Sequence, residues 1–219
     1  MIKEEIINMK KLVIAGLSVM MLAGCGNKTE QLEEFYTQID TVNAKEKPVV
    51  EVNKNLQKLE SEKVELFNKI SKAKKQEIKV INNTATKLVK NASARSAAID
   101  KEIKAYDESE AEFKKAKDLA SEIKDKDQKK EASDLTNALE KKYKEHDGLM
   151  TAYKDVLKKE NDLFKYLEGK SPETSEVNSK IENLNKSTSA FQKNMTTFNK
   201  TMEQVQKESG DIVKLLNDK

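Results

Sequence analysis

The sequence predicts an all-α protein, and more closely an elongated antiparallel up-and-down helical bundle of four long helices whose first arm is bent near Pro48. Charged residues make up 36% of the 219 residues, whereas only 6 are Gly and 2 are Pro. β-Sandwiches, β-barrels and doubly wound sheets need more turn-forming residues and more β-branched runs than this. The apolar residues recur instead in steps of three and four, which is the spacing of one helix face.

Residues 1–24 are predicted to be a lipoprotein signal peptide. Lys10 and Lys11 precede an apolar stretch over 12–21. As a helix this stretch would span about 15 Å, half of a hydrocarbon core of roughly 30 Å. It is therefore typical of a cleaved signal and not of a membrane-spanning anchor. Met9 is the expected start of translation, because the acidic residues upstream of it offset the positive charge there.

The four residues after this stretch, Leu22-Ala23-Gly24-Cys25, match the lipobox of bacterial lipoproteins. The motif implies that the Cys25 thiol receives a diacylglyceryl group and becomes the new N-terminus. Two acyl chains hold a protein stably on a bilayer, whereas one chain binds only marginally. We therefore expect a lipid anchor at Cys25 on the extracytoplasmic face of the cell membrane. Residues 25–28 would be a tether, and residues 29–219 a single helical-bundle domain.

Two amphipathic segments are expected in the first part of the mature chain, over 29–45 and 49–80. They meet near Pro48, which lacks a backbone N–H and ends or bends a helix. The apolar stripe of the second segment slips out of phase beside Asn82-Asn83-Thr84, which favours a turn near residue 82. The alternative is a stutter within one continuous helix over 49–123, which would make a three-helix, spectrin-like coil.

Three further helices are expected over 84–123, 129–168 and 171–216. The segment 124–130 has no apolar residue and is expected to be a turn. Ser171-Pro172 would place an N-cap and a proline at the start of the last helix. Helices of similar length joined by short connections are what an antiparallel bundle requires. The expected core includes Leu56, Leu88, Leu139, Phe191 and Phe198, with His146 as an interior or boundary histidine and Met195 and Met202 as core filling.

Catalytic chemistry is not indicated, and we expect no enzyme activity, no metal and no cofactor. One Cys and one His exclude a disulfide framework, a Cys/His zinc site and a His–Cys catalytic couple. Gly169-Lys170-Ser171 resembles the end of a phosphate-binding loop, but Pro172 follows it and no strand precedes it. Asp125 and Asp127 begin like a calcium loop, but Lys130 stands where the glycine of such a loop should be.

The segment from Lys69 to Arg95 is the one feature of the sequence that suggests a binding site. It holds eight basic residues against Glu77 alone, a local charge of +7 in a chain whose total is +3. Lysine side chains are mobile point charges, which suit a repetitive anionic polymer. A merely solvated lysine-rich surface is the alternative. The candidate polymer-binding residues are Lys72, Lys74, Lys75, Lys79, Lys87, Lys90 and Arg95.

The chain resembles the YkyA-like family of cell-wall-binding lipoproteins of Firmicutes. The resemblance rests on the lipobox, on the arm Gln31-Leu32-Glu33-Glu34-Phe35-Tyr36 and on the long Lys- and Glu-rich helices through Leu216. It implies a helical bundle and cell-wall association without enzyme activity.

The expected partners are the membrane, through the lipid on Cys25, and peptidoglycan or a teichoic-acid-type polymer. A nearly balanced total charge does not indicate a nucleic-acid partner. The alternative function is that of a structural or chaperone-like adaptor for another protein of the cell envelope.

Overall fold

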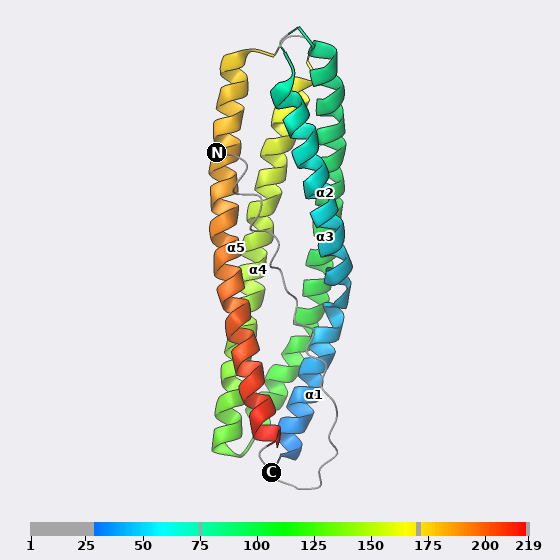
Figure 1. Cartoon of the computed structure of the whole chain (residues 1–219). Coiled ribbons are helices and arrows are strands. Elements are labelled where there is room, and N and C mark those ends of the chain that lie inside the picture. The colour runs from blue at the N-terminus through cyan, green and yellow to red at the C-terminus, as the bar shows by residue number, and fades with distance from the viewer. Residues whose placement is uncertain (1–28, 75, 170–171, 218–219) are drawn as a thin grey trace. The chain divides into compact units, whose positions relative to one another are not determined.

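The computed structural model describes residues 29–74, 76–169 and 172–217, and within these ranges it contains five α-helices and no strand (Figure 1). This confirms the predicted all-α class. The lipobox and Cys25 lie outside the described residues. The helices are α1 (Glu30–Lys45), α2 (Lys47–Lys72), α3 (Ile78–Glu122), α4 (Lys126–Leu167) and α5 (Thr174–Asn217).

The described helices divide into two compact units, each made of four helical segments. Unit 1 comprises residues 51–102 and 148–195, which are most of α2, the first part of α3, the second part of α4 and the first part of α5. Unit 2 comprises α1 with the first residues of α2, together with residues 103–147 and 196–217. Each unit by itself is a helical bundle, and α2, α3, α4 and α5 contribute residues to both.

The predicted bend near Pro48 is confirmed. α1 ends at Lys45 and α2 begins at Lys47, so Pro48 lies in the first turn of α2, where its missing N–H breaks no helical hydrogen bond. Glu46 is the residue between the two helices. Its N–H donates to the carbonyl of Asn43 (3.1 Å), and its carbonyl accepts from the N–H of Val49 (2.9 Å).

The predicted turn near residue 82 is wrong, because the connection between α2 and α3 lies over 73–77 and Asn82-Asn83-Thr84 is helical. Glu77 lies immediately before α3: its carbonyl accepts the N–H of Ile81 (3.2 Å), and its carboxylate accepts the backbone N–H of Lys74 (2.8 Å). The Thr84 hydroxyl bonds the Val80 carbonyl within the helix (2.7 Å). The turn propensity of Asn and Thr is therefore overridden, because Thr84 and the following Ala85 are buried in unit 1. The alternative of one continuous helix over 49–123 is also wrong.

The α3–α4 connection is shorter than predicted, and α5 begins later than predicted. α4 begins at Lys126, inside the expected turn, because the Asp125 carboxylate caps it by accepting the N–H groups of Asp127 (3.0 Å) and Gln128 (3.1 Å). α5 begins at Thr174, so Pro172 precedes the helix and is not its first residue. Ser171, the predicted N-cap, lies outside the described residues.

Each unit has its own apolar core. In unit 1, Leu88 packs with Leu163, Phe164 and Leu167 of α4, and Phe191 of α5 stacks on Tyr153 with ring centroids 4.7 Å apart. In unit 2, Leu139 and Phe198 are 1% exposed. The predicted core positions Leu88, Leu139, Phe191 and Phe198 are thus confirmed as buried, whereas Leu56, Met195 and Met202 are half-buried.

Candidate functional site

Most lysines of the predicted polymer-binding segment are exposed, and all of them belong to unit 1. The exposed lysines, at the end of α2, in the connection 73–77 and in the first part of α3, are Lys69, Lys72, Lys74, Lys79, Lys87 and Lys90. Within the described parts of the chain none of the six forms an ion pair. Lys75 lies outside the described residues. Their role in polymer binding stays a prediction.

Arg95 does not belong to this exposed set, so its inclusion among the polymer-binding residues is wrong. Its side chain is 0% exposed, because Arg95 follows Leu88 and Ala92 on the inward face of α3. The guanidinium forms ion pairs with Glu60 of α2 (2.8 Å) and with Glu160 of α4. A positive charge that is buried and paired in this way cannot contact a polymer at the surface.

The Arg95 cluster is a charge-balanced network inside unit 1. Lys63 Nζ lies 2.5 Å from a Glu60 oxygen and 3.2 Å from a Glu160 oxygen, so two cations face two carboxylates. Tyr153 donates its hydroxyl proton to Glu60 (2.5 Å). Asn91 accepts from the Arg95 Nε (2.9 Å) and donates to the Leu59 carbonyl (2.9 Å). Three helices of the unit are therefore joined through one set of buried polar groups.

The ionisation of this network follows from its neighbours. Burial alone would raise the pKa of Glu60, but the positive charges of Lys63 and Arg95 and the hydrogen bonds to the carboxylate lower that pKa overall. Burial and the Glu60 charge raise the pKa of Tyr153 well above its ordinary value. Glu60 is thus held as the carboxylate and Tyr153 as the neutral phenol.

A second buried cluster lies in unit 2, beside the bend between α1 and α2. Glu46 is 7% exposed and pairs with Lys142 of α4. Ser109 of α3 donates to Glu46 (2.6 Å) and contacts the hydroxyl of Tyr143 (2.8 Å). Burial raises the pKa of Tyr143, and the Glu46 charge adds to the shift. The bend is therefore fixed to α3 and α4 by one buried carboxylate.

His146 is confirmed as an interior residue of unit 2. It is 1% exposed, and its ring stacks on that of Tyr106 with centroids 3.5 Å apart and planes 2° from parallel. Lys142 lies one helical turn before it, with Nζ 5.3 Å from the centroid of the Tyr106 ring. The histidine belongs to an aromatic core and is not exposed to a ligand.

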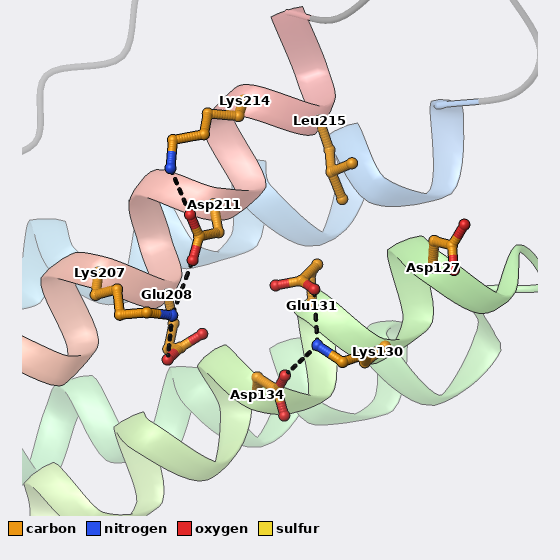
Figure 2. Close-up of a pocket in the computed structure, with 9 residues that line it drawn as sticks. All are labelled: Asp127, Lys130, Glu131, Asp134, Lys207, Glu208, Asp211, Lys214 and Leu215. Carbon is orange, nitrogen blue, oxygen red and sulfur yellow. Dashed lines mark hydrogen bonds and ion pairs between the residues drawn. The ribbon is translucent and has the colours of Figure 1, made fainter.

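An open pocket of unit 2, shown in Figure 2, is lined by charged residues of α4 and α5. Glu131, Asp134 and Glu208 each offer a carboxylate oxygen within 4.8 Å of the others. These acids are already neutralised by lysines of their own helices: Lys130 lies 2.8 and 2.9 Å from Glu131 and Asp134, and Lys207 lies 3.1 Å from Glu208. The pocket is thus a set of surface ion pairs.

The ion pairs along α5 continue with Asp211, which lies 2.9 Å from Lys207 and 2.7 Å from Lys214. These two hydrogen-bonded lysines lower the pKa of Asp211 to about 2. Figure 2 shows that each ion pair drawn joins residues of the same helix, so none of them links α4 to α5.

Sequence reasoning missed both buried clusters. Glu60, Glu160 and Lys142 are charged residues on the inward faces of their helices, where an apolar stripe is expected. A helical projection could have identified them as interruptions of the stripe. Their partners depend on which helices meet and at what register, and a single sequence does not show this. Within the part of the chain that the structure describes, no helix has both the length and the apolar content to cross a membrane.

Comparisons with known proteins give consistent results. A family model, YkyA, with the description "Putative cell-wall binding lipoprotein", matches residues 30–215. The "Uncharacterized lipoprotein YkyA" of Bacillus subtilis (strain 168) is 26% identical over 193 residues, which are 88% of this chain and 86% of the relative. A crystal structure of a conserved protein of unknown function from Staphylococcus aureus is similar, with a TM-score of 0.77 and 27% identity. That similarity covers 90% of this chain and 100% of the other.

Proposed function

Since the chain belongs to the YkyA family of lipoproteins, we propose that it is a membrane-anchored, non-enzymatic surface lipoprotein that binds the cell wall. Cys25 carries the lipid in this proposal, and the exposed lysines around the α2–α3 connection bind an anionic wall polymer. The family match supports the lipoprotein class. The lipobox supports the position of the anchor.

The observation that carries the wall-binding proposal is the group of six exposed lysines without ion-pair partners in the described structure, from Lys69 to Lys90. Elsewhere in unit 1, three exposed lysines are paired, namely Lys54 with Glu51, Lys154 with Asp100 and Lys186 with Glu182, whereas Lys58, Lys101 and Lys158 form no ion pair in the described structure. An unpaired lysine keeps its full charge available to a ligand. The unpaired lysines lie closest together in the sequence around the α2–α3 connection, and this density of unpaired charge supports the α2–α3 end of unit 1 as the surface for a polyanion.

Binding of this kind is expected to be weak for each lysine and strong only through many contacts. A lysine ammonium is a point charge with no fixed fork, so it does not select one phosphate geometry. Exposed charges are screened over about 8 Å at physiological ionic strength. Retention on the wall should therefore fall steeply as salt is added.

The anchor is tested by replacing Cys25 with Ser. The variant is expected to accumulate as precursor that does not incorporate labelled palmitate, whereas the wild type does. Equal labelling of the two proteins would contradict the assignment of Cys25.

The wall-binding surface is tested by sedimentation with purified cell walls, with and without their teichoic acids. The variant Lys74→Gln/Lys75→Gln/Lys79→Gln/Lys87→Gln should lose most retention in low salt without loss of helicity. A matched control with the same change in charge replaces four exposed lysines elsewhere in unit 1. The control positions are Lys54, Lys58, Lys158 and Lys186.

Undiminished retention of the first variant on walls that carry teichoic acid would overturn the wall-binding surface. The adaptor function, which relies on apolar contact with another envelope protein, would then be the better explanation. Equal loss in the two variants would mean that total charge, and not this surface, sets the retention.

A further inference from the structure

Four lysines of α3 in unit 1 lie on one exposed face of the helix. We name Lys79, Lys87, Lys90 and Lys101 the α3 lysine track, and all four are exposed. At about 100° per residue their positions fall within an arc of roughly 80° around the helix axis. Lys101 lies outside the segment that the sequence singled out, and only the helix geometry brings it together with the others.

No track lysine has a carboxylate one helical turn away on its own helix, although Asp100 and Glu102 flank Lys101 in the sequence. The residues three and four positions from each track lysine include no Asp or Glu. Two acidic residues occur in α3 between Ile78 and Glu102: Asp100 pairs with Lys154 of α4 (2.9 Å), and Glu102 is 3% exposed. Lys87 and Lys90 are instead neighbours of like charge, which is locally unfavourable and would be relieved by a bound anion.

The middle of the track is open to close approach. Ser93, Ala94 and Ala97 are exposed and lie between Lys90 and Lys101. A chain lying along this face would meet small side chains there and lysine ammonium groups towards both ends.

The spacing of the lysines favours a long ligand over a small one. With a rise of about 1.5 Å per residue, the steps from Lys79 to Lys87, Lys90 and Lys101 are about 12, 4.5 and 16.5 Å along the axis. A single phosphate could contact at most the pair Lys87 and Lys90. A linear chain of phosphodiesters could contact all four over about 33 Å.

We propose that the α3 lysine track binds a linear polyphosphodiester that lies along the axis of α3. The inference rests on the proposed wall-binding function and specifies its ligand class and orientation. The proposed function assigns binding to the exposed lysines around the α2–α3 connection. The α3 lysine track instead extends the contacts to Lys101 and excludes the lysines of the connection 73–77.

The test uses the mature chain, residues 25–219, with Cys25→Ser so that no lipid contributes to binding. The probe is glycerol-phosphate polymer freed of its lipid, and affinity is measured by calorimetry at low salt. The variant Lys79→Gln/Lys87→Gln/Lys90→Gln/Lys101→Gln should lose about tenfold or more in affinity. The control at Lys54, Lys58, Lys158 and Lys186 should lose less than about twofold. Two further probes should bind more weakly than the long polymer. One is poly-glutamate of equal charge, and the other is a phosphodiester oligomer long enough to reach only from Lys87 to Lys90.

Lys101→Gln alone separates this inference from the proposed function. One outcome would refute the α3 lysine track but keep the proposed function. In that outcome Lys101→Gln binds the polymer as the wild type does, while the Lys74/Lys75/Lys79/Lys87 variant loses affinity. If neither variant loses affinity, the proposed wall-binding surface fails as well. If the oligomers bind as tightly as the polymer, or the control variant loses as much as the track variant, the proposed orientation along α3 is overturned.

Discussion

Arg95 in unit 1 and Lys142 in unit 2 are both buried cations, but the groups that surround them differ. The planar guanidinium of Arg95 reaches two carboxylates on two other helices and a side-chain amide on its own. The ammonium of Lys142 reaches one carboxylate, Glu46, and lies near the rings of Tyr106 and Tyr143. The buried cation of unit 1 thus contacts groups of three helices, whereas that of unit 2 is paired with the one residue that joins α1 and α2.

Arginine presents several donors in a fixed fork, whereas lysine concentrates its charge at one atom. The network of unit 1 includes two carboxylates and is nearly closed to solvent, and both Arg95 and the partly buried Lys63 contact the two carboxylates. The buried cluster of unit 2 is built on the pair of Glu46 and Lys142, supported by hydroxyl groups and by aromatic faces that attract a cation. Both arrangements satisfy the buried charges, which would otherwise be costly.

The largest effect is expected from removing the arginine. Arg95→Met leaves Glu60 and Glu160 facing each other with only Lys63 to offset them, and should lower the free energy of unfolding by about 5 kcal/mol. Urea denaturation followed by circular dichroism measures the change. The triple variant Arg95→Met/Glu60→Gln/Glu160→Gln should recover most of the loss, since it removes all three charges. A single variant as stable as the wild type would show that the network contributes nothing.

A smaller loss is expected in unit 2. Lys142→Met leaves the Glu46 carboxylate without its cation, although Glu46 keeps the hydrogen bond from Ser109. The free energy of unfolding should therefore fall by about 3 kcal/mol in the same measurement. Lys142→Met and Arg95→Met should each shift one common transition if residues 29–219 form a single domain, as the sequence predicts. Two separate transitions, each sensitive to one variant only, would contradict that prediction.

The pH dependence sharpens the comparison further. Because the folded-state pKa of Glu60 is lowered, its contribution to stability is present above its unfolded pKa of about 4.5 and is lost as pH falls through the folded value. The stability gap between wild type and Glu60→Gln should therefore be widest near neutral pH and should narrow below about pH 4.5. Glu51→Gln, at a position whose side chain is 83% exposed, is the control. A gap that stays constant from neutral to acid pH would be inconsistent with the charge of Glu60 stabilising unit 1.

The smallest change in the free energy of unfolding is expected at two helical glycines, Gly148 of unit 1 and Gly210 of unit 2. A Cβ placed on either would meet nothing within 4 Å. Alanine loses less backbone freedom on folding, so Gly148→Ala and Gly210→Ala should each raise the free energy of unfolding by about 0.5–1 kcal/mol. A loss of stability at Gly148 alone would indicate that the hydrogen bond from Asn194 to its carbonyl depends on the glycine.

The helices and their buried faces could be predicted from the sequence, because the apolar residues repeat with the period of a helix. The bend near Pro48 followed from one local property, the missing N–H. The α2–α3 connection was misplaced because Asn82-Asn83-Thr84 has turn propensity, and the burial of Thr84 and Ala85 outweighs that propensity. Arg95 was assigned to a surface because its neighbours in sequence are basic, whereas its position on the helix turns it inward to Glu60 and Glu160.

The candidate site, too, has features that could be predicted from the sequence and features that could not. The lipobox and the surplus of lysine are local and could be recognised from the sequence. The α3 lysine track depends on which lysines share a helix face and lack partners. These lysines could be identified only once the structure gave the start of α3 at Ile78 and the ion pairs of the neighbouring helices.

Arg95 is the one arginine among the 41 basic residues of the chain. A lysine at position 95 would carry its charge at one atom and would lack the fixed fork of donors, so we expect that it would not bond Glu60, Glu160 and Asn91 at once. The buried network thus accounts for the one exception in the composition of the chain.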